Sequence, residues 1–516
     1  MATPPVKQEP VGFTPYFGGF ILETLTIGMY GEARSAIREY IQNGFDAIQR
    51  ARDLKHLAKD AGKITITMAA DKKSLIIRDD GAGLPAISAV QTLTRIGASS
   101  KKHTKNAGFR GIGRLAGIVF CDKLTFITKA KGERKQTMVV FDAKAMRAAM
   151  SPEKGSAASA EDVMRKHVHP FQSATARVAE HFFEVRIEGL RDAPIECTSP
   201  QAMRDYVGQV APVPYPSDFP YRNRLAAAEK ASGIPIDEVE ITVVGGGKSH
   251  AVHKRYGAKY EFDGGEIGLT DCDIHTSPTG RWWAWIGKKA ESGAYTDARV
   301  RGLRIRVRNI QIDGAELFRD IFRDNRKSQI RFQDYYLGEI FVKPTALVPN
   351  ARRDGFEEDS SWRGVRKELG TVAKALGSEA YAVSTAGQLS LDAQKEGLKK
   401  TSADFRKLKK AKFADVDKTV ALIRTITTRQ KRVAKASEAA EMATVAALTA
   451  IGAEYIDMKI EALRHVGDAA ATLDREKVEV EAREALMAEI MELLDEQLSP
   501  KCLAEVRELL ADFLDE

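Results

Sequence analysis

The spacing of apolar residues predicts a first domain in which helices pack on a sheet. Residues 31–56 carry apolar side chains at helical intervals, namely Ile37, Tyr40, Ile41, Phe45 and Ile48. Clean alternation over residues 63–68 and an apolar run over 74–78 predict two strands joined by a turn at 71–73. Further strands are predicted at 123–128 and within 181–190, whereas 150–180 lacks a regular pattern and is predicted to be a long loop or insertion.

The remaining chain divides into a second mixed region and a helical one. In residues 303–308 apolar side chains alternate with Arg304, Arg306 and Arg308, which predicts a strand with a basic stripe on one face. Beyond residue 360 Ala, Leu, Glu and Lys dominate, and these are strong helix formers. The pattern therefore predicts an α/β (α+β) fold with domains at 1–195, 196–360 and 361–516. The last domain is all-helical, and the apolar face of its final helix suits dimerisation or partner binding.

Composition excludes several classes of protein. The chain has 516 residues, of which 43% are hydrophobic, enough to build large cores and too many for a disordered or fibrous chain. No segment approaches the ~20 consecutive apolar residues of a membrane span, and the N-terminus lacks the pattern of a secretory signal. The four scattered cysteines, with no C-x-x-C pair, predict a reduced, cytoplasmic protein without a zinc site.

The net charge of +8 is unevenly distributed. Residues 395–435 contain 14 Lys or Arg against 4 Asp or Glu, whereas residues 436–516 contain 7 against 20. The first segment therefore carries +10 and the second −13. Three interpretations remain open: pairing of the basic and acidic segments within one chain or between two, two solvated helix faces, or a nucleic-acid surface.

Three short motifs lie in the first domain. Glu39, Asn43 and Asp46 are spaced by four and three residues, which puts them on one helix face. A carboxylate beside an amide oxygen suits bound Mg²⁺ and an attacking water, because this metal prefers oxygen ligands and shares its coordination sphere with phosphates. Asp79, followed by Gly81 and Gly83, comes directly after a strand, where a carboxylate can accept a hydrogen bond from an exocyclic base amine.

The third motif is rich in glycine and lysine. It comprises Ile96–Lys101 and Gly108–Gly113, whose backbone amides can cradle phosphates. Each motif alone is also typical of a solvated helix face, a turn or a flexible loop, but their order within ~75 residues favours a nucleotide site. The phosphate-loop pattern G-x-x-x-x-G-K-[ST] is absent, and the glycines do not follow the first strand of a βαβ unit as in a dinucleotide fold.

These motifs resemble those of the GHKL ATPases, the superfamily of gyrase, heat-shock-protein-90 chaperones, histidine kinases and MutL. The resemblance lies in LETLTIGMYGEARSAIREYIQNGFDAI, IIRDDGAGL, IGASSK and GFRGIGRLAG, and it is nearest to bacterial chaperone-like members of that type. It is specific over roughly residues 20–130, and it continues more loosely in GLRIRVRNIQI, YYLGEI and LVPNARRDGFE. It implies a Bergerat-type ATPase domain, a sandwich of helices on a mixed sheet, with ATP and Mg²⁺ as cofactors.

The resemblance also implies roles for individual residues. Glu39 would be the general base that activates water, Asn43 the Mg²⁺ ligand, and Asp79 the partner of the adenine amine. An arginine of the middle domain would complete the site, with Arg353 as the first choice and Arg352 as the near alternative. Further nucleotide contacts are implied for Asp46, Gly81, Gly83, Ser99, Ser100, Lys101, Gly108, Phe109, Arg110, Gly111, Ile112 and Gly113.

The chain also departs from the family. The chaperones and MutL usually carry a Gly-Thr pair on the strand that closes the nucleotide site, whereas residues 180–184 here read EHFFE. The chaperone dimerisation domain is replaced by an unfamiliar helical one. The threonine contact, client binding and co-chaperone recruitment are therefore not carried over to this chain.

Four functions are compatible with these observations. The first is a chaperone-type ATPase clamp, in which ATP closes a lid over residues 88–113 and brings together two N-terminal domains of a homodimer on an unidentified protein client. The alternative is a nucleic-acid-associated ATPase of the MutL or microrchidia kind, in DNA maintenance or defence, binding through its basic surface. A histidine kinase is disfavoured because the ATPase domain comes first, and the intact Glu39 argues against a nucleotide-binding scaffold.

Overall fold

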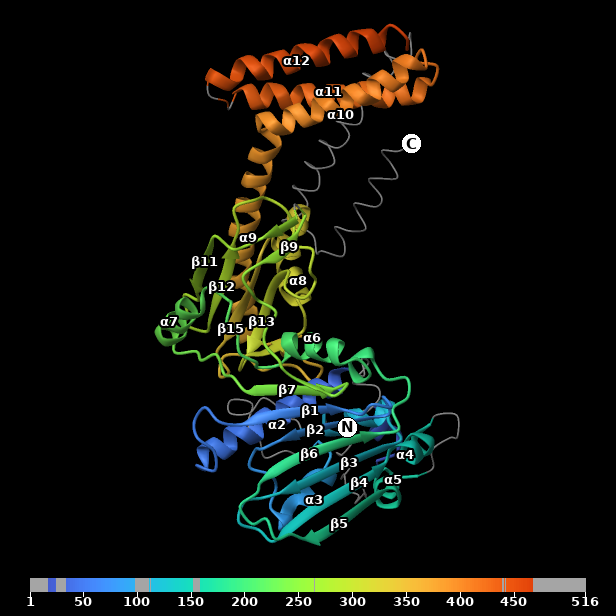
Figure 1. The fold of residues 1–516 in the computed structure, drawn as a ribbon, viewed down its shortest axis with the longest axis vertical. Helices are drawn as coiled ribbons and strands as arrows, with labels where there is room; N and C mark the ends of the chain where they lie inside the picture. Colours follow the sequence, from blue (N-terminus) through green and yellow to red (C-terminus); the bar gives the residue numbers. More distant parts are fainter. Residues whose placement is uncertain are drawn as a thin grey trace, which may run out of the picture. The chain divides into compact units, whose positions relative to one another are not determined.

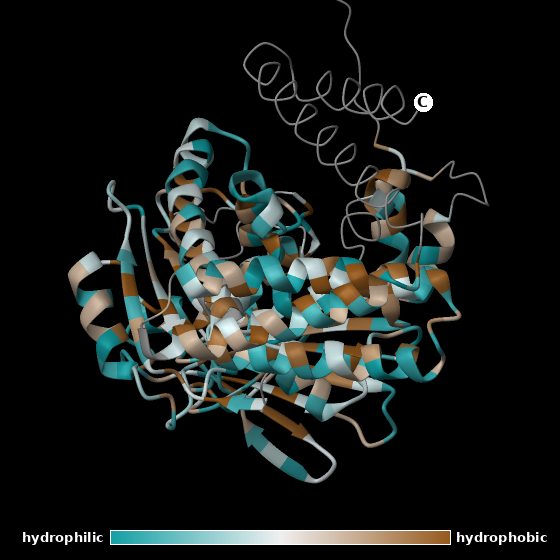
Figure 2. Cartoon of the chain, turned by 90° about the horizontal axis from the view of Figure 1, so that it is seen from above, coloured by the Kyte–Doolittle hydropathy of each residue, from teal (hydrophilic) through white to brown (hydrophobic). Residues whose placement is uncertain are grey.

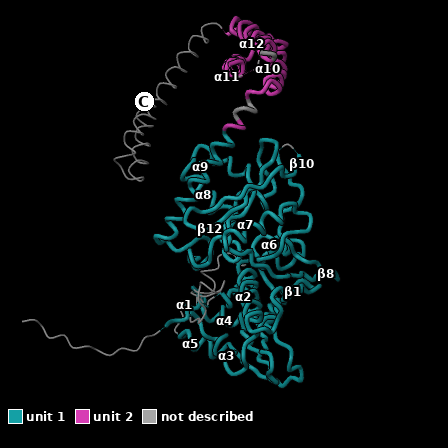
Figure 3. Tube along the Cα trace, turned by 90° about the vertical axis from the view of Figure 1, so that its left-hand side faces the viewer, with its two compact units in different colours: residues 1–381 teal, residues 382–516 magenta. Residues whose placement is uncertain are grey.

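The computed structural model describes residues 17–24, 34–97, 111, 113–151, 158–263, 265–438, 440 and 442–466. The chain divides into two compact units, Met1–Tyr381 and Ala382–Glu516, which Figure 3 colours separately. The described part of unit 1 contains an eight-stranded sheet, a five-stranded sheet and a two-stranded sheet of β9 and β10, with their helices, and the described part of unit 2 is helical (Figure 1). The predicted α/β class with a helical C-terminal region is confirmed.

An eight-stranded mixed sheet underlies the N-terminal part of unit 1. Its order is β5-β4-β3-β6-β2-β1-β7-β8. The strands are β1 (Lys63–Met68), β2 (Ser74–Asp79), β3 (Lys123–Lys129), β4 (Lys135–Asp142), β5 (Val168–Ala174), β6 (Phe182–Glu188), β7 (Glu240–Gly245) and β8 (Lys248–Ala251). Strand β7 pairs in parallel with β1, so the sheet extends beyond the boundary predicted at residue 195.

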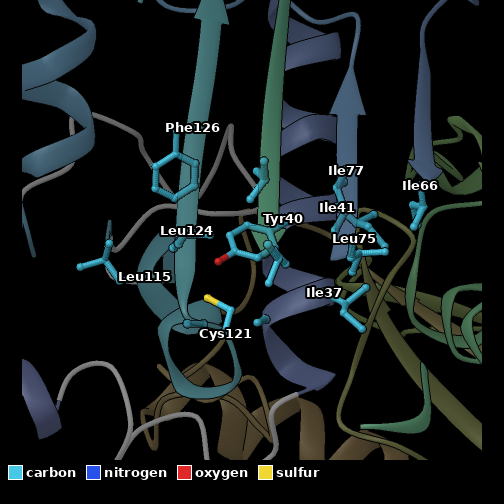
Figure 4. Close-up of a cluster of buried hydrophobic side chains, with 14 of the residues drawn as sticks. Ile37, Tyr40, Ile41, Ile66, Leu75, Ile77, Leu115, Cys121, Leu124 and Phe126 are labelled. Atoms are coloured by element: carbon cyan, nitrogen blue, oxygen red, sulfur yellow. The ribbon is translucent and has the colours of Figure 1, made fainter. Parts of the chain in front are cut away.

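Helices cover one face of this sheet and enclose its core. They are α1 (Phe20–Glu23), α2 (Arg34–Asp53), α3 (Ala86–Thr94), α4 (Ala143–Met150), α5 (Ala160–His167) and the 3₁₀ helix η2 (Gly113–Phe120). Helix α2 packs on β1, β2 and β6. Figure 4 shows Ile37, Tyr40 and Ile41 of α2 among apolar side chains of the sheet, as their helical spacing predicts.

The segment predicted to be irregular is ordered in part, which corrects that expectation. Residues 160–174 form α5 and then β5, an edge strand that pairs with β4. The Ser159 side chain accepts a hydrogen bond from the backbone amide of Asp162 and caps the helix. After Val168 the residues of β5 are exposed, so this edge strand lacks the alternation that marks a half-buried strand.

A five-stranded sheet in the order β11-β12-β15-β13-β14 forms the second part of unit 1. The elements from residue 195 are η4 (Ile195–Cys197), α6 (Pro200–Val210), α7 (Arg222–Ser232), β9 (Tyr260–Phe262), β10 (Gly265–Ile267), β11 (Asp271–Thr276), β12 (Trp282–Lys288), β13 (Gly302–Val307), β14 (Ile310–Ile312), α8 (Glu316–Asn325), η5 (Lys327–Tyr335), β15 (Leu337–Val342) and α9 (Ser360–Leu389). Both faces of this sheet are buried, since Trp282 packs in one apolar cluster and Trp283 and Trp285 in another.

The predicted basic stripe on β13 is not a solvent-exposed surface. Arg304 and Arg306 are 3% and 1% exposed, and Arg306 pairs with the buried Glu339 of β15. Arg308 lies 3.7 Å from Asp237 and is also largely covered. The alternation of residues 303–308 was correct, but the second face of the strand is buried as well. Nucleic-acid contact through this stripe is therefore excluded.

The described part of unit 2 contains the end of α9 and, after it, three helices that pack together. They are α10 (Leu391–Lys410), α11 (Val416–Glu438) and α12 (Met442–Leu463). Figure 2 shows hydrophilic and hydrophobic residues on the same helices, and the apolar residues form a common core that includes Phe405, Ile426 and Tyr455. The predicted final helix and Cys502 lie outside the described residues. None of the described helices has the length and hydropathy of a membrane span.

Candidate functional site

Helix α2 carries the first predicted motif on the margin of its buried face. Glu39 is 8% exposed and Asp46 4%, while Asn43, one turn from Glu39, is half-buried. The opposite side of the helix holds Ile37 and Ile41 in the core. This burial fixes the rotation of the helix, and the three polar residues share a face as their spacing predicts.

Glu39 pairs with an arginine from the far part of unit 1. Arg353 Nε lies 3.3 Å from Glu39 Oε1. The neighbouring residue of α2, Arg38, donates from Nη2 to the carbonyl of Arg352 at 2.9 Å. The side chain of Arg352 is exposed. Of the two candidate arginines, Arg353 is thus the one whose guanidinium lies against the carboxylate.

The backbone around Arg353 is held by a tight turn. Arg353 adopts a left-handed φ of 58°, and its amide donates to the carbonyl of Asn350 at 3.3 Å. Its own carbonyl accepts from the amide of Asp313 at 2.8 Å. Burial raises the pKa of the Asp313 carboxyl to about 6, and the nearby Glu316 contributes to the increase. The arginine is therefore presented by an anchored loop.

The second motif forms a tight turn at the end of β2. The Asp79 carboxylate is 5% exposed and accepts from the Gly81 amide at 2.9 Å through Oδ1. Gly83 has φ +63°, and a Cβ there would lie 2.0 Å from the Lys129 carbonyl oxygen. A residue with a side chain would not fit at this position, since both the conformation and the space require glycine.

Glycines also surround the Asp79 carboxylate. A Cβ at position 44 would lie 3.2 Å from Asp79 Oδ2, and one at position 81 would lie 2.7 Å from Oδ1. Side chains at positions 44 and 81 would crowd this carboxylate, so glycine at both positions keeps space beside Asp79.

Two residues that the sequence analysis did not single out hold this turn in place. His181 Nδ1 lies 2.8 Å from the carbonyl oxygen of Gly81. Thr128 Oγ1, on β3, accepts from the Leu84 amide at 2.8 Å and donates to the Phe182 carbonyl at 3.1 Å. Neither residue belongs to a recognisable motif, so only the folded sheet brings them to the turn.

The strand without the Gly-Thr pair lies between β2 and β3. Phe183 of β6 is opposite Asp79 in the register of the sheet, and Thr128 is opposite Phe183 on the other side. The Phe183 ring is half-buried, with its centroid 5.8 Å from that of Phe126. An aromatic ring, rather than a threonine, therefore stands beside the aspartate on this strand.

The third motif is only partly described. Gly111 has φ +74°, and Gly113 begins η2, where a Cβ would lie 2.1 Å from Glu39 Oε2. This end of the motif therefore lies directly against the carboxylate of α2. The other residues predicted there fall outside the described residues: Ser99, Ser100, Lys101, Gly108, Phe109, Arg110 and Ile112.

The described residues suit ATP and Mg²⁺. Asn43 carries an amide oxygen one helical turn after Glu39, and Mg²⁺ prefers such oxygen ligands. Next to it, the buried Gln42 has an amide whose nitrogen and oxygen lack hydrogen-bond partners among the described residues. An unsatisfied buried amide is costly unless a ligand or water completes its hydrogen bonds. The donor set is therefore compatible with a nucleotide and its metal.

Comparison with known proteins finds similarity over the part of the chain that carries Glu39 and Asp79. Residues 31–175 match the family described as histidine kinase-, DNA gyrase B-, and HSP90-like ATPase. The chaperone protein HtpG of Rickettsia rickettsii (strain Sheila Smith) is 29% identical over 135 residues, which are 23% of this chain and 22% of that protein. HtpG of Rickettsia bellii (strain OSU 85-389) is 28% identical over 148 residues, 25% of this chain and 24% of that protein. The similarity therefore spans less than a quarter of the length of each of these two relatives.

Proposed function

We propose that the chain is a Mg²⁺-dependent ATP hydrolase that works as a chaperone-type clamp. Residues 31–175, which match the histidine kinase-, DNA gyrase B-, and HSP90-like ATPase family, would be its ATPase domain. The observation that carries this proposal is the contact between Glu39 and Arg353, which joins the α2 motif to a residue near the end of the second sheet. Asp79 and its glycine turn supply the base-binding end of the same site.

Each residue has a role that its surroundings support. Glu39 orients a water molecule and accepts its proton as the water attacks the terminal phosphate. Arg353 offers a charge for the transferred phosphoryl group, and its anchored turn limits the freedom of the guanidinium. Asn43 would hold Mg²⁺, which neutralises phosphate charge. Asp79 accepts a hydrogen bond from the adenine amine.

The same contact suggests how nucleotide binding becomes movement. In this structure Arg353 is paired with Glu39, so a bound terminal phosphate would compete with the carboxylate for the guanidinium. That exchange would couple the nucleotide to the second part of unit 1. Lid closure over residues 88–113, association of two chains into a homodimer and action on a protein client extend this proposal.

Steady-state ATP hydrolysis, measured with and without Mg²⁺, tests the enzymatic part. Glu39→Gln keeps the shape of the side chain and removes the base, so we expect bound nucleotide but a loss of turnover of at least about 10²-fold. Arg50→Ala, an exposed position on the same helix, is the matched control and is expected to retain turnover. Equal hydrolysis by Glu39→Gln and wild type would refute the assigned base, and an absence of nucleotide binding would refute the site.

A second candidate function rests on exposed basic residues in unit 2. Lys395, Lys399, Arg406 and Lys410 are exposed and lie on one face of α10, spaced by four, seven and four residues. Such a row can neutralise nucleic-acid phosphates, as the alternative of a nucleic-acid-associated clamp requires.

Binding of duplex DNA at 50, 100 and 200 mM salt tests this second candidate. We expect affinity to fall steeply with salt. A variant with Lys395, Lys399, Arg406 and Lys410 all changed to Gln should bind more weakly, and its affinity should depend less on salt. A variant with four exposed alanines of unit 2 changed to Gln, at Ala403, Ala411, Ala414 and Ala434, is the matched control. Binding that is unchanged by loss of the four charges would exclude this face.

A further inference from the structure

A buried polar cluster lies where the second sheet meets the first part of unit 1. It consists of Lys254, Arg306, Asn309 and Glu339, which are all at most 2% exposed. Lysine, arginine and glutamate are almost never fully buried unless they are paired. Such a cluster is costly to desolvate, and its presence is weak evidence that it stabilises the fold.

Two cations converge on one carboxylate in this cluster. Lys254 Nζ donates to both oxygens of Glu339, at 2.9 and 2.8 Å, and to Asn309 Oδ1 at 2.6 Å. Arg306 Nε and the Tyr215 hydroxyl also donate to Glu339. Burial lowers the pKa of Lys254 to about 7, and the neighbouring Arg306 adds to this decrease. Burial alone would raise the pKa of Glu339, but Arg306 and Lys254 lower it to about 2.

The cluster joins elements of both sheets. Lys254 follows β8 of the eight-stranded sheet, whereas Arg306 and Glu339 belong to β13 and β15 of the five-stranded sheet. Arg306 Nη2 also donates to the carbonyl of Gln209 on α6 at 2.7 Å. Asn309 Nδ2 donates to the carbonyl of Asp237, just before β7, at 2.7 Å. These hydrogen bonds tie the second sheet to α6 and to the residue segments that flank β7 and β8 of the first sheet.

A short segment leads from this cluster to Arg353. Arg308 and Asn309 both have left-handed φ angles, 52° and 58°, which form the tight turn between β13 and β14. Ile310 then enters the apolar core of the first sheet and is 1% exposed. Asp313, directly after β14, donates its amide to the carbonyl of Arg353.

We propose that the Lys254–Glu339–Arg306–Asn309 cluster is a joint that fixes β14 and thereby holds Arg353 against Glu39. Lys254 and Asn309 are then positioning residues for ATP hydrolysis, and they act through Arg353 without contacting nucleotide. This inference rests on the proposed function, because it assigns the joint to the same reaction. It follows from two hydrogen bonds and the segment between them. Lys254 donates to Asn309, the chain runs from Asn309 through β14 to Asp313, and the Asp313 amide donates to the carbonyl of Arg353.

A double-mutant cycle on ATP hydrolysis tests the joint. Lys254→Met removes the ammonium but leaves Glu339 paired with Arg306, so the carboxylate is not left unpaired. We expect kcat to fall about tenfold with nucleotide affinity unchanged. In an Arg353→Ala background the same substitution should cause no further loss, because the arginine through which it acts is absent. Lys289→Met is the control, since Lys289 donates to a backbone carbonyl of the same unit, that of Tyr335, outside the joint.

The outcomes separate the joint from the proposed function. Turnover that is lost in Arg353→Ala establishes the role of the arginine, whatever the joint does. An equal fall in kcat for Lys254→Met in both backgrounds, or no fall at all, would overturn the joint alone. Absence of turnover in the wild type would overturn both proposals. If Lys254→Met does not fold, Asn309→Asp replaces it, because aspartate tolerates the left-handed conformation but cannot donate to Asp237; the same two-background comparison then decides.

Discussion

Arg353 Nε lies 3.3 Å from Glu39 Oε1, and the two side chains are only 8% and 10% exposed. The pair joins a helix near the start of the chain to a loop that follows the last strand of the second sheet. Because both charges are largely withdrawn from water, their pairing offsets part of the cost of burying them. The ion pair therefore connects the assigned base on α2 directly to the loop that follows β15.

Replacing Arg353 by alanine is expected to lower kcat by about 10²-fold or more, since a charge aimed at the transferred phosphoryl group is lost. Arg352→Ala is the matched control. Its exposed side chain makes no contribution to the Glu39 pair, and its carbonyl still accepts from Arg38 in the variant. Steady-state hydrolysis of ATP measures both. A larger loss in Arg352→Ala than in Arg353→Ala would reverse the assignment of the two arginines.

Gly113→Ala is expected to disturb the assigned base directly. The added Cβ would lie 2.1 Å from Glu39 Oε2, so the carboxylate must move away from its present position. We expect kcat to fall at least about tenfold, because a displacement of about 1 Å in a catalytic group can cost 10²-fold.

Gly452→Ala is a suitable control for the glycine substitution. Gly452 lies within α12, where the nearest atom to an added Cβ is a Val433 methyl carbon at 3.6 Å, so alanine fits and turnover should be unchanged. Unchanged turnover in Gly113→Ala, with the thermal midpoint also unchanged, would mean that the present position of the carboxylate is not needed for hydrolysis.

Much of the first motif could be predicted because its signal is local. Helical spacing placed Glu39, Asn43 and Asp46 on one side of α2, and the apolar residues of that helix fixed which side is buried. The turn at Asp79 could be predicted for the same reason, because Gly81 and Gly83 come within four residues of the end of the strand. Local sequence patterns were therefore sufficient to predict a residue's position where that position depends on one helix or one turn alone.

Contacts between distant segments could not be predicted in this way. Alternation showed that Arg304 and Arg306 share a face of their strand, but it could not show that this face is also covered. Nor could the pattern of residues 240–251 reveal that they extend the first sheet beside β1. Pairing partners depend on the whole fold, so burial of charge and strand order emerged only from the structure.

His181→Ala is expected to weaken ATP binding several-fold while kcat at saturating ATP changes little. His181 Nδ1 contacts the Gly81 carbonyl, which belongs to the turn that carries Asp79, and loss of one hydrogen bond costs about 1 kcal/mol. Equilibrium binding of ATP and the KM for ATP measure the effect. His169→Ala, on the exposed edge strand β5, is the control. A fall in kcat with unchanged affinity would place the role of His181 elsewhere.

The carboxyl of Asp313 predicts a pH-dependent stability. Burial raises its pKa to about 6 in the folded chain, above the ordinary value of 3.8, so the folded state holds this proton more tightly than the unfolded state. The resulting stabilisation is complete below about pH 4 and is lost as the pH rises through about 6. At pH 8 a partly buried negative charge remains beside the loop of Arg353.

Asp313→Asn removes this titration and keeps the left-handed backbone, which asparagine tolerates well. We expect the Tm of Asp313→Asn minus the Tm of the wild type to be larger at pH 8 than at pH 5. Asp271→Asn is the control, because a hydrogen bond from the Cys272 amide and one from Arg224 lower the pKa of Asp271. That carboxyl is ionised at both pH values in either state, so the Tm difference should be the same at pH 5 and 8. A Tm difference for Asp313→Asn that is equally independent of pH would contradict the raised pKa.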